Sequence, residues 1–269
     1  MSEDHGSRQN GVRHANGHPA LGGKGTDLRP GGAPTEPPAR QPAFNLPPVI
    51  IAFALVLAAV HLGRTVLLSP EADLAVILRF AFIPAIYGND ASALPVAAAR
   101  WWMPFSYTLL HGDWLHLGMN LLWMAVFGSP VARRFGAIPF FALTLLASAG
   151  GALAHYLYFP GAFVPMIGAS GAVSGYVGAA SRFVFTPGGF RGGASFRHDG
   201  PAQTLAASFA NRNFLSFVGV WFVLNILSGS GILQMPGQSD AGIAWQAHIG
   251  GFLAGLLGFG LFERLRNRP

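Results

Sequence analysis

A serine at position 170 lies between glycines in the run Gly168-Ala169-Ser170-Gly171, directly at the start of an apolar stretch. A serine hydroxyl becomes a nucleophile when a nearby base takes its proton, and the N-terminus of a helix supplies N–H groups that stabilise negative charge. A chain with 36 glycines among 269 residues produces such a motif readily by chance. A packing face of small residues is therefore the plain alternative if Ser170 is considered alone.

Histidine and asparagine side chains interrupt two other apolar segments. One segment opens with His111-Gly-Asp-Trp-Leu-His116-Leu-Gly-Met-Asn120, in which Asp113 is expected to cap a helix. His116 and Asn120 are four residues apart and so share one face of that helix. His248 lies within the last apolar segment. Polar groups in hydrocarbon are costly unless they face partners or a water-filled cavity, which favours a functional interpretation.

These side chains can be given roles in acyl transfer. Ser170 would attack a carbonyl while His248 takes its proton as general base. The developing oxyanion would be stabilised by the Ser170 backbone N–H, the Asn120 amide and the His116 ring. His111 lies just outside the helix and is expected to order the loop, whereas His116 and Asn120 could instead join helices without chemistry.

The composition indicates a membrane protein. Half of the residues are apolar, 10% are charged and the mean hydropathy is positive at +0.41, which is the profile of several membrane-spanning helices. The net charge of +6 is spread over short loops and tails without a basic stripe, so no nucleic-acid partner is expected. The absence of cysteine excludes disulfides and thiolate-bound metal.

Six apolar runs have the length and composition of membrane helices. They are Pro48 to Leu68, Leu115 to Val131, Ile138 to Tyr158, Ser170 to Phe185, Phe214 to Leu227 and Ile243 to Phe262. Ser170 lies 15 residues above Phe185, His248 lies 15 above Glu263 and Asn120 lies 13 above Arg133, all counted from the inner side. All three groups are thus expected about 20 to 22 Å along their helices, at one depth.

Small residues predict close contact between the fourth and sixth helices. Gly171-x-x-x-Gly175 on one is expected to face Gly251-x-x-x-Gly255 on the other, because small residues let backbones approach. Ala172, Gly178 and Ala254 are expected to extend these smooth faces. Such contact would bring Ser170 within hydrogen-bonding distance of His248.

The distribution of basic residues predicts the orientation. Fourteen of the 17 Lys and Arg residues fall on the side that holds both termini, which places both termini in the cytosol. Residues 1–46 are rich in Gly, Pro and polar residues and are expected to form a disordered cytosolic tail before a membrane domain at 47–264. Residues 265–269 would form a short C-terminal tail.

Two connections differ in character. The connection from Ser69 to about Leu110 is long and aromatic, so it is expected to lie in the outer interface, with a short helix near Leu74 to Phe82 and with Phe80, Phe82 and Trp102 packed on the bundle. The connection from Pro187 to Asn213 is expected to be an ordinary mobile cytosolic loop.

Taken together, the motifs resemble those of the rhomboid family of intramembrane serine proteases. The resemblance covers about Pro48 to Arg264 and rests on Gly-x-Ser-Gly at 168–171, His-x4-His-x3-Asn at 111–120 and Ala-His-x-x-Gly at 247–251. It implies an all-α bundle of six transmembrane helices in a multi-pass membrane protein that cleaves single-span membrane proteins near their outer ends. It also implies that the fifth helix and the Ser228 to Gly242 loop act as gate and cap, and a compact six-helix form suggests a bacterial inner membrane.

The chain departs from the family pattern at two positions. Trp102-Met103 stands where the family usually has Trp-Arg, so an arginine anchor of the first loop is missing. Ser174 stands where many members have a tyrosine that stacks on the histidine. Tyr176 or Trp221 is considered as a substitute partner of His248.

Two other classes of function are weighed against the protease. The first is a rhomboid-like pseudoprotease or membrane chaperone that binds helices without cleaving them, which an intact Ser170 and His248 pair argues against. The second is a metal site of His111, His116 and His248, which the absence of His-Glu-x-x-His and of an acid at that depth disfavours. No cofactor is expected, and the oligomeric state is not predicted.

Overall fold

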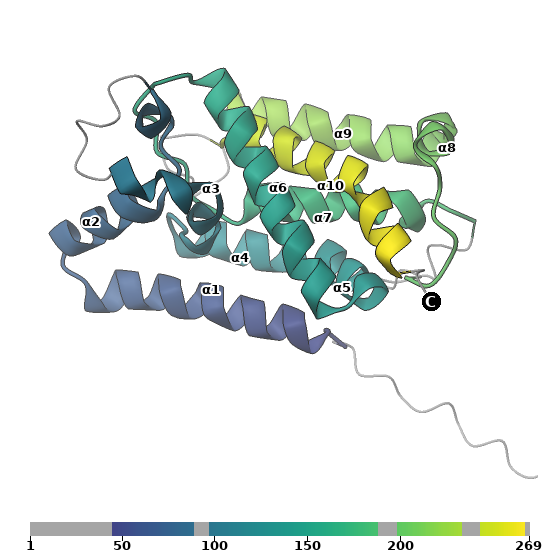
Figure 1. Ribbon diagram of the computed structural model, residues 1–269, viewed down its shortest axis with the longest axis horizontal. Helices are drawn as coiled ribbons and strands as arrows, with labels where there is room; N and C mark the ends of the chain where they lie inside the picture. Colours follow the sequence, from purple (N-terminus) through teal and green to yellow (C-terminus); the bar gives the residue numbers. More distant parts are fainter. Residues whose placement is uncertain (1–44, 89–96, 188–197, 233–242, 267–269) are drawn as a thin grey trace, which may run out of the picture. The chain divides into compact units, whose positions relative to one another are not determined.

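The computed structural model describes residues 45–88, 97–187, 198–232 and 243–266. Within these ranges the regular structure is helical, apart from one isolated bridge between Phe82 and Met166. Residues 1–44 of the predicted tail at 1–46 lie outside the described residues, as do residues 233–242 of the predicted cap at 228–242. The helices are α1 (Pro48–Leu67), α2 (Pro70–Phe80), α3 (Met103–Ser106), α4 (Trp114–Trp123), α5 (Ser129–Phe135), α6 (Ala137–Tyr158), α7 (Ser170–Val184), α8 (Leu205–Ala210), α9 (Arg212–Gly229) and α10 (Trp245–Arg266) (Figure 1).

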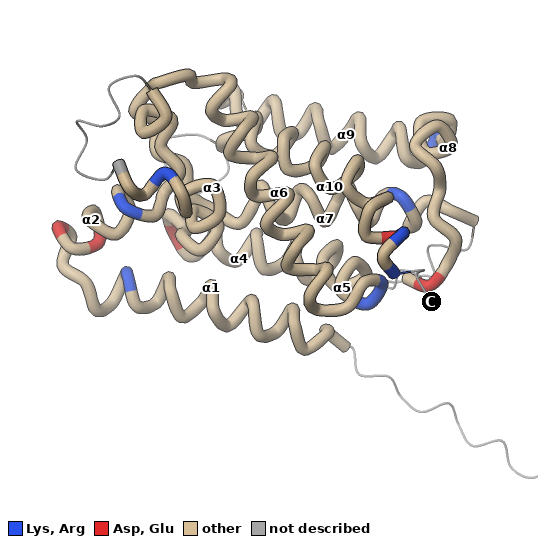
Figure 2. The backbone as a smooth tube through the Cα atoms, in the orientation of Figure 1, with Lys and Arg blue, Asp and Glu red and all other residues tan. Residues whose placement is uncertain are grey.

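Five of the described segments are long and apolar enough to cross a membrane. They are α1, the continuous stretch Trp114–Phe135, α6, α9 and α10. With α7, which has only 15 residues, they form the predicted all-α bundle of six helices. Figure 2 shows charged residues at the two ends of this bundle and a charge-free band between them, as a bilayer core requires.

The second span is one helix with an irregular turn. A π-helical turn, η5 (Met124–Gly128), joins α4 to α5. Pro130 lies just after it, lacks an N–H and would press its ring against the carbonyl four residues earlier. The wider π turn relieves that conflict, so the span continues to Phe135.

Helix α7 lies at the centre of the bundle. All of its residues from Gly171 to Val184 are buried, although the helix carries few large side chains. It packs against α6 and α10 and also contacts the η5 turn. Because other helices surround α7, it does not have to cross the full thickness of the lipid. It can therefore begin below the predicted outer surface of the bilayer.

The outer connection folds onto the bundle, as predicted, but with different side chains. Helix α2 begins at Pro70, four residues before the predicted start, because Ser69 caps it. Phe82 is buried as expected, whereas Phe80 and Trp102 are exposed, which corrects the prediction for both. Trp102 instead donates its ring N–H to the carbonyl of Arg79.

An arginine of α1 anchors this connection. The Arg64 guanidinium forms two hydrogen bonds with the Asp73 carboxylate of α2, at 2.7 and 3.1 Å, and donates a third to the His111 carbonyl at 3.0 Å. Met103, where the family usually has arginine, is fully buried. The anchor predicted to be missing is therefore supplied from α1.

The inner connection is more ordered than predicted where it is described. Residues 205–210 form α8, and the Gln203 carbonyl accepts two hydrogen bonds from the Arg182 guanidinium of α7. Arg134 of α5 pairs with the Glu263 carboxylate of α10 through two bonds of 2.8 Å. These buried cations join the inner ends of the helices.

Candidate active site

Helices α7 and α10 touch through their backbones. A Cβ atom added at Gly251 would collide with the carbonyl group of Gly171, and one added at Gly255 would collide with the carbonyl group of Gly175. The matching order of these pairs shows that the two helices run parallel. The predicted contact of the two glycine faces is thus confirmed, because only glycine permits this approach.

The prediction that Ala254 extends the α7-facing surface of α10 is wrong. Ala254 faces Gly150 of α6, and Gly250 faces Gly150 and Ala154 of the same helix, so α6 and α10 run antiparallel. Gly178 does face α10, where the backbone of Phe252 excludes any side chain at position 178. Helix α10 is therefore in close contact with two helices on adjacent faces.

This seam places Ser170 and His248 at one level. Ser170 directly precedes Gly171, and His248 lies one turn before Gly251. The carbonyl oxygen of Ala247 is 3.7 Å from a Cβ position at Gly171. Both side chains are half-buried, and within the described residues no hydrogen bond joins the Ser170 hydroxyl to His248. Such bonds often tighten only when a substrate binds.

The residue before the turn into α7 must be glycine. Gly168 has a φ of +123°, which side chains of L-residues rarely adopt. A Cβ there would also lie 2.6 Å from Nε2 of His116 and 3.6 Å from the Ser170 hydroxyl. The His116 ring therefore occupies the space beside Gly168, next to the serine, as expected for a shared site.

The segment that leads to Ser170 is fastened by the outer connection. The Gly168 N–H donates to the Tyr107 carbonyl at 3.0 Å, and Met166 and Phe82 exchange two backbone hydrogen bonds. The Ala169 N–H points to Nε2 of His111 at 3.4 Å. His111 thus orders the loop, as predicted.

His111 can accept this hydrogen bond because it is neutral. Its ring is fully buried, and burial lowers its pKa to about 3, with the nearby His116, His61 and Arg64 adding to the effect. A protonated ring would have no lone pair for the Ala169 N–H. Burial also raises the pKa of Tyr107, whose hydroxyl donates to the Ser148 carbonyl at 3.0 Å.

The start of α4 is built as predicted. The Asp113 carboxylate caps the helix by accepting the His116 N–H at 2.7 Å. The Gly112 N–H approaches Nδ1 of His116 at 3.5 Å, which favours the tautomer with its proton on Nε2, the atom beside Gly168 and Ser170. Asn120 is buried and donates one amide hydrogen to the His116 carbonyl at 2.9 Å, which leaves its second hydrogen.

The partner of His248 was not predicted. Nδ1 of His248 lies 2.5 Å from Oδ1 of Asn225 on α9. Tyr176 bonds instead to Thr144 and stacks on Phe140, and Trp221 stacks on Phe252, so neither substitutes for the absent tyrosine. Asn225 is a single amide in the apolar run of α9. The free-energy cost of a polar group in lipid, which pointed to Asn120, could also have pointed to Asn225.

Ser174, which stands where many family members have a tyrosine, makes a different contact. The Ser174 hydroxyl donates to the carbonyl of Ser170 at 2.7 Å, one turn back along α7. Ser174 is buried, and among the described residues no hydrogen bond joins it to His248.

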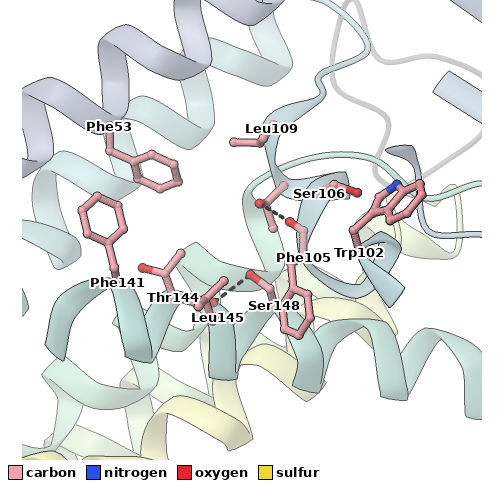
Figure 3. Close-up of a pocket in the computed structure, with 10 residues that line it drawn as sticks. Phe53, Trp102, Phe105, Ser106, Leu109, Phe141, Thr144, Leu145 and Ser148 are labelled. Atoms are coloured by element: carbon pink, nitrogen blue, oxygen red, sulfur yellow. Dashed lines mark hydrogen bonds between the residues drawn. The ribbon is translucent and has the colours of Figure 1, made fainter. Parts of the chain in front are cut away.

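Two other features do not contribute to the site. Among the described residues, no group of three His, Asp or Glu side chains is arranged to hold a metal ion, so the alternative site of His111, His116 and His248 is not formed. A pocket of about 330 Å³ lies between α1, α3 and α6 and is lined by none of the candidate residues (Figure 3). Its Ser148 and Thr108 hydroxyls bond to neighbouring backbone carbonyls.

Comparison with known proteins relates this chain to one protein family. Residues 98–264 match the Rhomboid domain family. The chain is 27% identical over 170 residues to rhomboid protease GluP of Bacillus subtilis, 29% identical over 164 residues to RHOMBOID-like protein 4 of Arabidopsis thaliana, and 39% identical over 77 residues to rhomboid protease GlpG of Haemophilus influenzae.

The matches cover different shares of the proteins. They include 63%, 61% and 28% of this chain, respectively, and 27%, 34% and 40% of the relatives. The chain thus spans well under half the length of each relative. The matched family segment contains all the candidate residues, from His111 to His248.

Proposed function

This chain belongs to the rhomboid family, and from that premise we propose that it is a serine endopeptidase that cleaves membrane proteins within the bilayer. Two of the relatives are named as rhomboid proteases. The chain is a multi-pass membrane protein, and Ser170 and His248 lie at one level on the two helices of the α7–α10 seam. That juxtaposition is the observation that carries the proposal.

Ser170 is the proposed nucleophile and His248 the proposed base. The Ser170 hydroxyl oxygen attacks the carbonyl carbon of the scissile peptide bond, and its proton passes to Nε2 of His248. The tetrahedral intermediate collapses as His248 returns the proton to the leaving amine. Water then attacks the acyl-serine by the same route, which releases the acid and restores Ser170.

Three donors are proposed for the oxyanion. Ser170 begins α7, its N–H has no acceptor within the helix, and no side chain caps that end. The Nε2 proton of His116 and the free amide hydrogen of Asn120 lie on the neighbouring helix. Because these donors are held by a rigid scaffold, they need little reorganisation when charge develops.

The setting supports a membrane-embedded substrate. The candidate residues lie among apolar helices, and charges gather only at the ends of the bundle (Figure 2). We propose that the substrate is a single-span membrane protein cut near its outer end, and that both termini face the cytosol of a bacterium. The basic residues at the α5 and α10 ends fit that orientation.

The proposal is tested with purified protein in detergent or liposomes and a set of single-span substrates. Ser170→Ala, His248→Ala and the double variant should lose nearly the same activity, because one missing member already disables the nucleophile. Asn120→Ala should leave a slower enzyme, by about 10² to 10³ in rate. A fluorophosphonate should label Ser170 in the wild type and not after His248→Ala.

The outcomes separate the competing functions. Undiminished cleavage by Ser170→Ala would overturn the assignment of the nucleophile. Binding of helices by a wild-type protein that neither cleaves nor reacts with the phosphonate would identify a pseudoprotease. EDTA should leave cleavage unchanged, and loss of activity with EDTA would point to metal chemistry.

A further inference from the structure

The inference concerns Asn225, a polar residue in the middle of an otherwise apolar helix. It lies on α9, in the run Val223-Leu-Asn225-Ile-Leu, where an unpartnered amide would be costly in lipid. Both ends of its side chain are used: Nδ2 donates to the Trp221 carbonyl at 2.7 Å, and Oδ1 lies 2.5 Å from Nδ1 of His248.

The first of these bonds fixes the direction of the second. A carbonyl oxygen accepts only a donor, so the amide nitrogen must face Trp221 and the amide oxygen must face the ring of His248. An oxygen that lies 2.5 Å from Nδ1 requires a proton on Nδ1. In the neutral imidazole, Nε2 then carries the free lone pair, which is the atom that a general base uses.

The geometry therefore points to Asn225 as a positioning residue: we propose that it holds His248 in the reactive tautomer and orientation, and that it does so only while α9 is seated against α10. This inference rests on the proposed function. Asn225 does not touch the scissile bond and acts through His248. An amide also suits an apolar site better than a carboxylate, because it orients the ring without burying a charge.

The dependence on α9 follows from how that helix is held. Only 11% of the most apolar stretch of α9 is buried inside the protein. The corresponding share is 28% to 50% in the other four candidate spans. The described contacts of α9 include aromatic pairs, such as Trp221 stacked on Phe252 at 5.0 Å and Phe217 near Phe185 at 5.2 Å. The Trp245 side chain of α10 also packs closely on Gly229 at the end of α9. Among the described residues, no backbone-to-backbone contact like that of α7 and α10 holds it.

Movement of α9 away from α10 would thus remove the acceptor from His248. A substrate helix that displaces α9 on its way to Ser170 would disable the base until α9 returns. Closure of the protein around the substrate is therefore coupled to activation of Ser170, because α9 both closes the bundle and carries Asn225.

The experiment compares two amide-to-leucine variants. Asn225→Leu removes the acceptor, while Gln246→Leu removes a similar amide–imidazole bond, from Gln246 to His155 at 3.0 Å, elsewhere on α10. We expect Asn225→Leu to lower kcat about 10- to 100-fold with little change in KM, by analogy with metal-bound histidines that lose their hydrogen-bonded partner. Gln246→Leu should affect melting temperature more than kcat.

Two further variants separate positioning from packing. Asn225→Asp keeps an acceptor in the same place and should restore most of the lost rate. Asn225→Ala introduces no new bulk and should behave like Asn225→Leu, so a misfolded leucine variant does not decide the result. Labelling of Ser170 by a small fluorophosphonate, which needs no helix to pass α9, should fall in parallel with kcat.

Several outcomes would overturn the inference. Folded Asn225→Leu and Asn225→Ala proteins that label at the wild-type rate would show that the bond does not position the base. Faster substrate cleavage with unchanged labelling would make Asn225 a latch of α9 alone. If the wild type neither cleaves nor labels, the proposed function fails and the inference falls with it, a result distinct from the others.

Discussion

The α7–α10 seam and helix α9 hold the two sides of the candidate site by different means. Along the seam, glycines bring backbone against backbone, and Gly151, Gly171 and Ala247 meet beneath the Tyr107 hydroxyl. Helix α9 reaches the same site through aromatic side chains and one amide. The proposed nucleophile therefore lies on the side held by backbone contact, whereas the partner of the proposed base lies on the side held by side chains.

The difference reflects what each region must do. Without a hydrophobic driving force between helices in lipid, close backbone packing is the main source of strong association, and glycine faces supply it. An apolar side-chain contact can be exchanged for lipid at little cost. Under the proposed function, such a bundle can be rigid at Ser170 and still open at one neighbouring helix to admit a substrate helix.

The largest expected effect comes from adding a methyl group to the seam. Gly251→Ala would drive a Cβ into the carbonyl of Gly171, which cannot move without shifting α7. We expect a loss of about 3 kcal/mol or more in the free energy of unfolding, measured by thermal or denaturant unfolding in detergent.

The matched control is a glycine of α9. Gly219 has no atom within 4 Å of a Cβ position, so Gly219→Ala should fold normally and gain up to about 1 kcal/mol from helix propensity. Similar losses for both variants would contradict the contrast between the two regions.

A pH effect is expected on the rigid side, where buried His111 bonds to the loop before Ser170. Its pKa is lowered from 6.5 to about 3, so the unfolded chain binds a proton that the folded protein does not. This contribution to stability is complete above pH 6.5 and is lost as the pH falls from 6.5 towards 3. The expected loss is about 2 kcal/mol at pH 5 relative to pH 7.5.

The measurement compares unfolding of the wild type with that of His111→Asn, whose side chain does not titrate. The variant should be less stable at pH 7.5, and the gap should narrow by about 2 kcal/mol at pH 5. A gap that stays constant with pH would show that His111 is not held neutral by burial.

A smaller effect is expected where Tyr107 closes the junction of α6, α7 and α10. Tyr107→Phe removes a buried hydrogen bond to the Ser148 carbonyl and should cost about 1 kcal/mol in unfolding free energy. Tyr158→Phe is the control, because among the described residues the Tyr158 hydroxyl makes no hydrogen bond and is exposed. Equal effects would mean that the hydroxyl contributes nothing at the junction.

The smallest effect is expected on α9. Phe217 packs on Phe127 and Phe185, about two helical turns from Asn225. Phe217→Ala should loosen α9, and we expect about threefold slower phosphonate labelling of Ser170, close to 0.6 kcal/mol, together with easier access for a substrate helix. Labelling at the wild-type rate with faster substrate cleavage would separate the movement of α9 from the orientation of His248.

Several features of this protein could be predicted from the sequence because they depend on composition or local spacing. The six spans follow from runs of apolar residues, and the observed helices begin and end within a few residues of them. Asp113 was identified as a cap from its position before an apolar run, and the capping bond is present. The contact of the two glycine faces could be predicted because each helix carries two glycines four residues apart.

Tertiary structure alone decided which face of each helix meets which neighbour. In a bilayer both the lipid-facing and the buried faces are apolar, so periodicity does not distinguish them, and Ala254 was assigned to α7 although it faces α6. Likewise, Arg64 reaches Asp73 and His111, and Asn225 reaches His248, across sequence separations that no local pattern encodes. The orientation of the candidate base depends on such a contact, since a hydrogen bond between two helices exists only once both are packed.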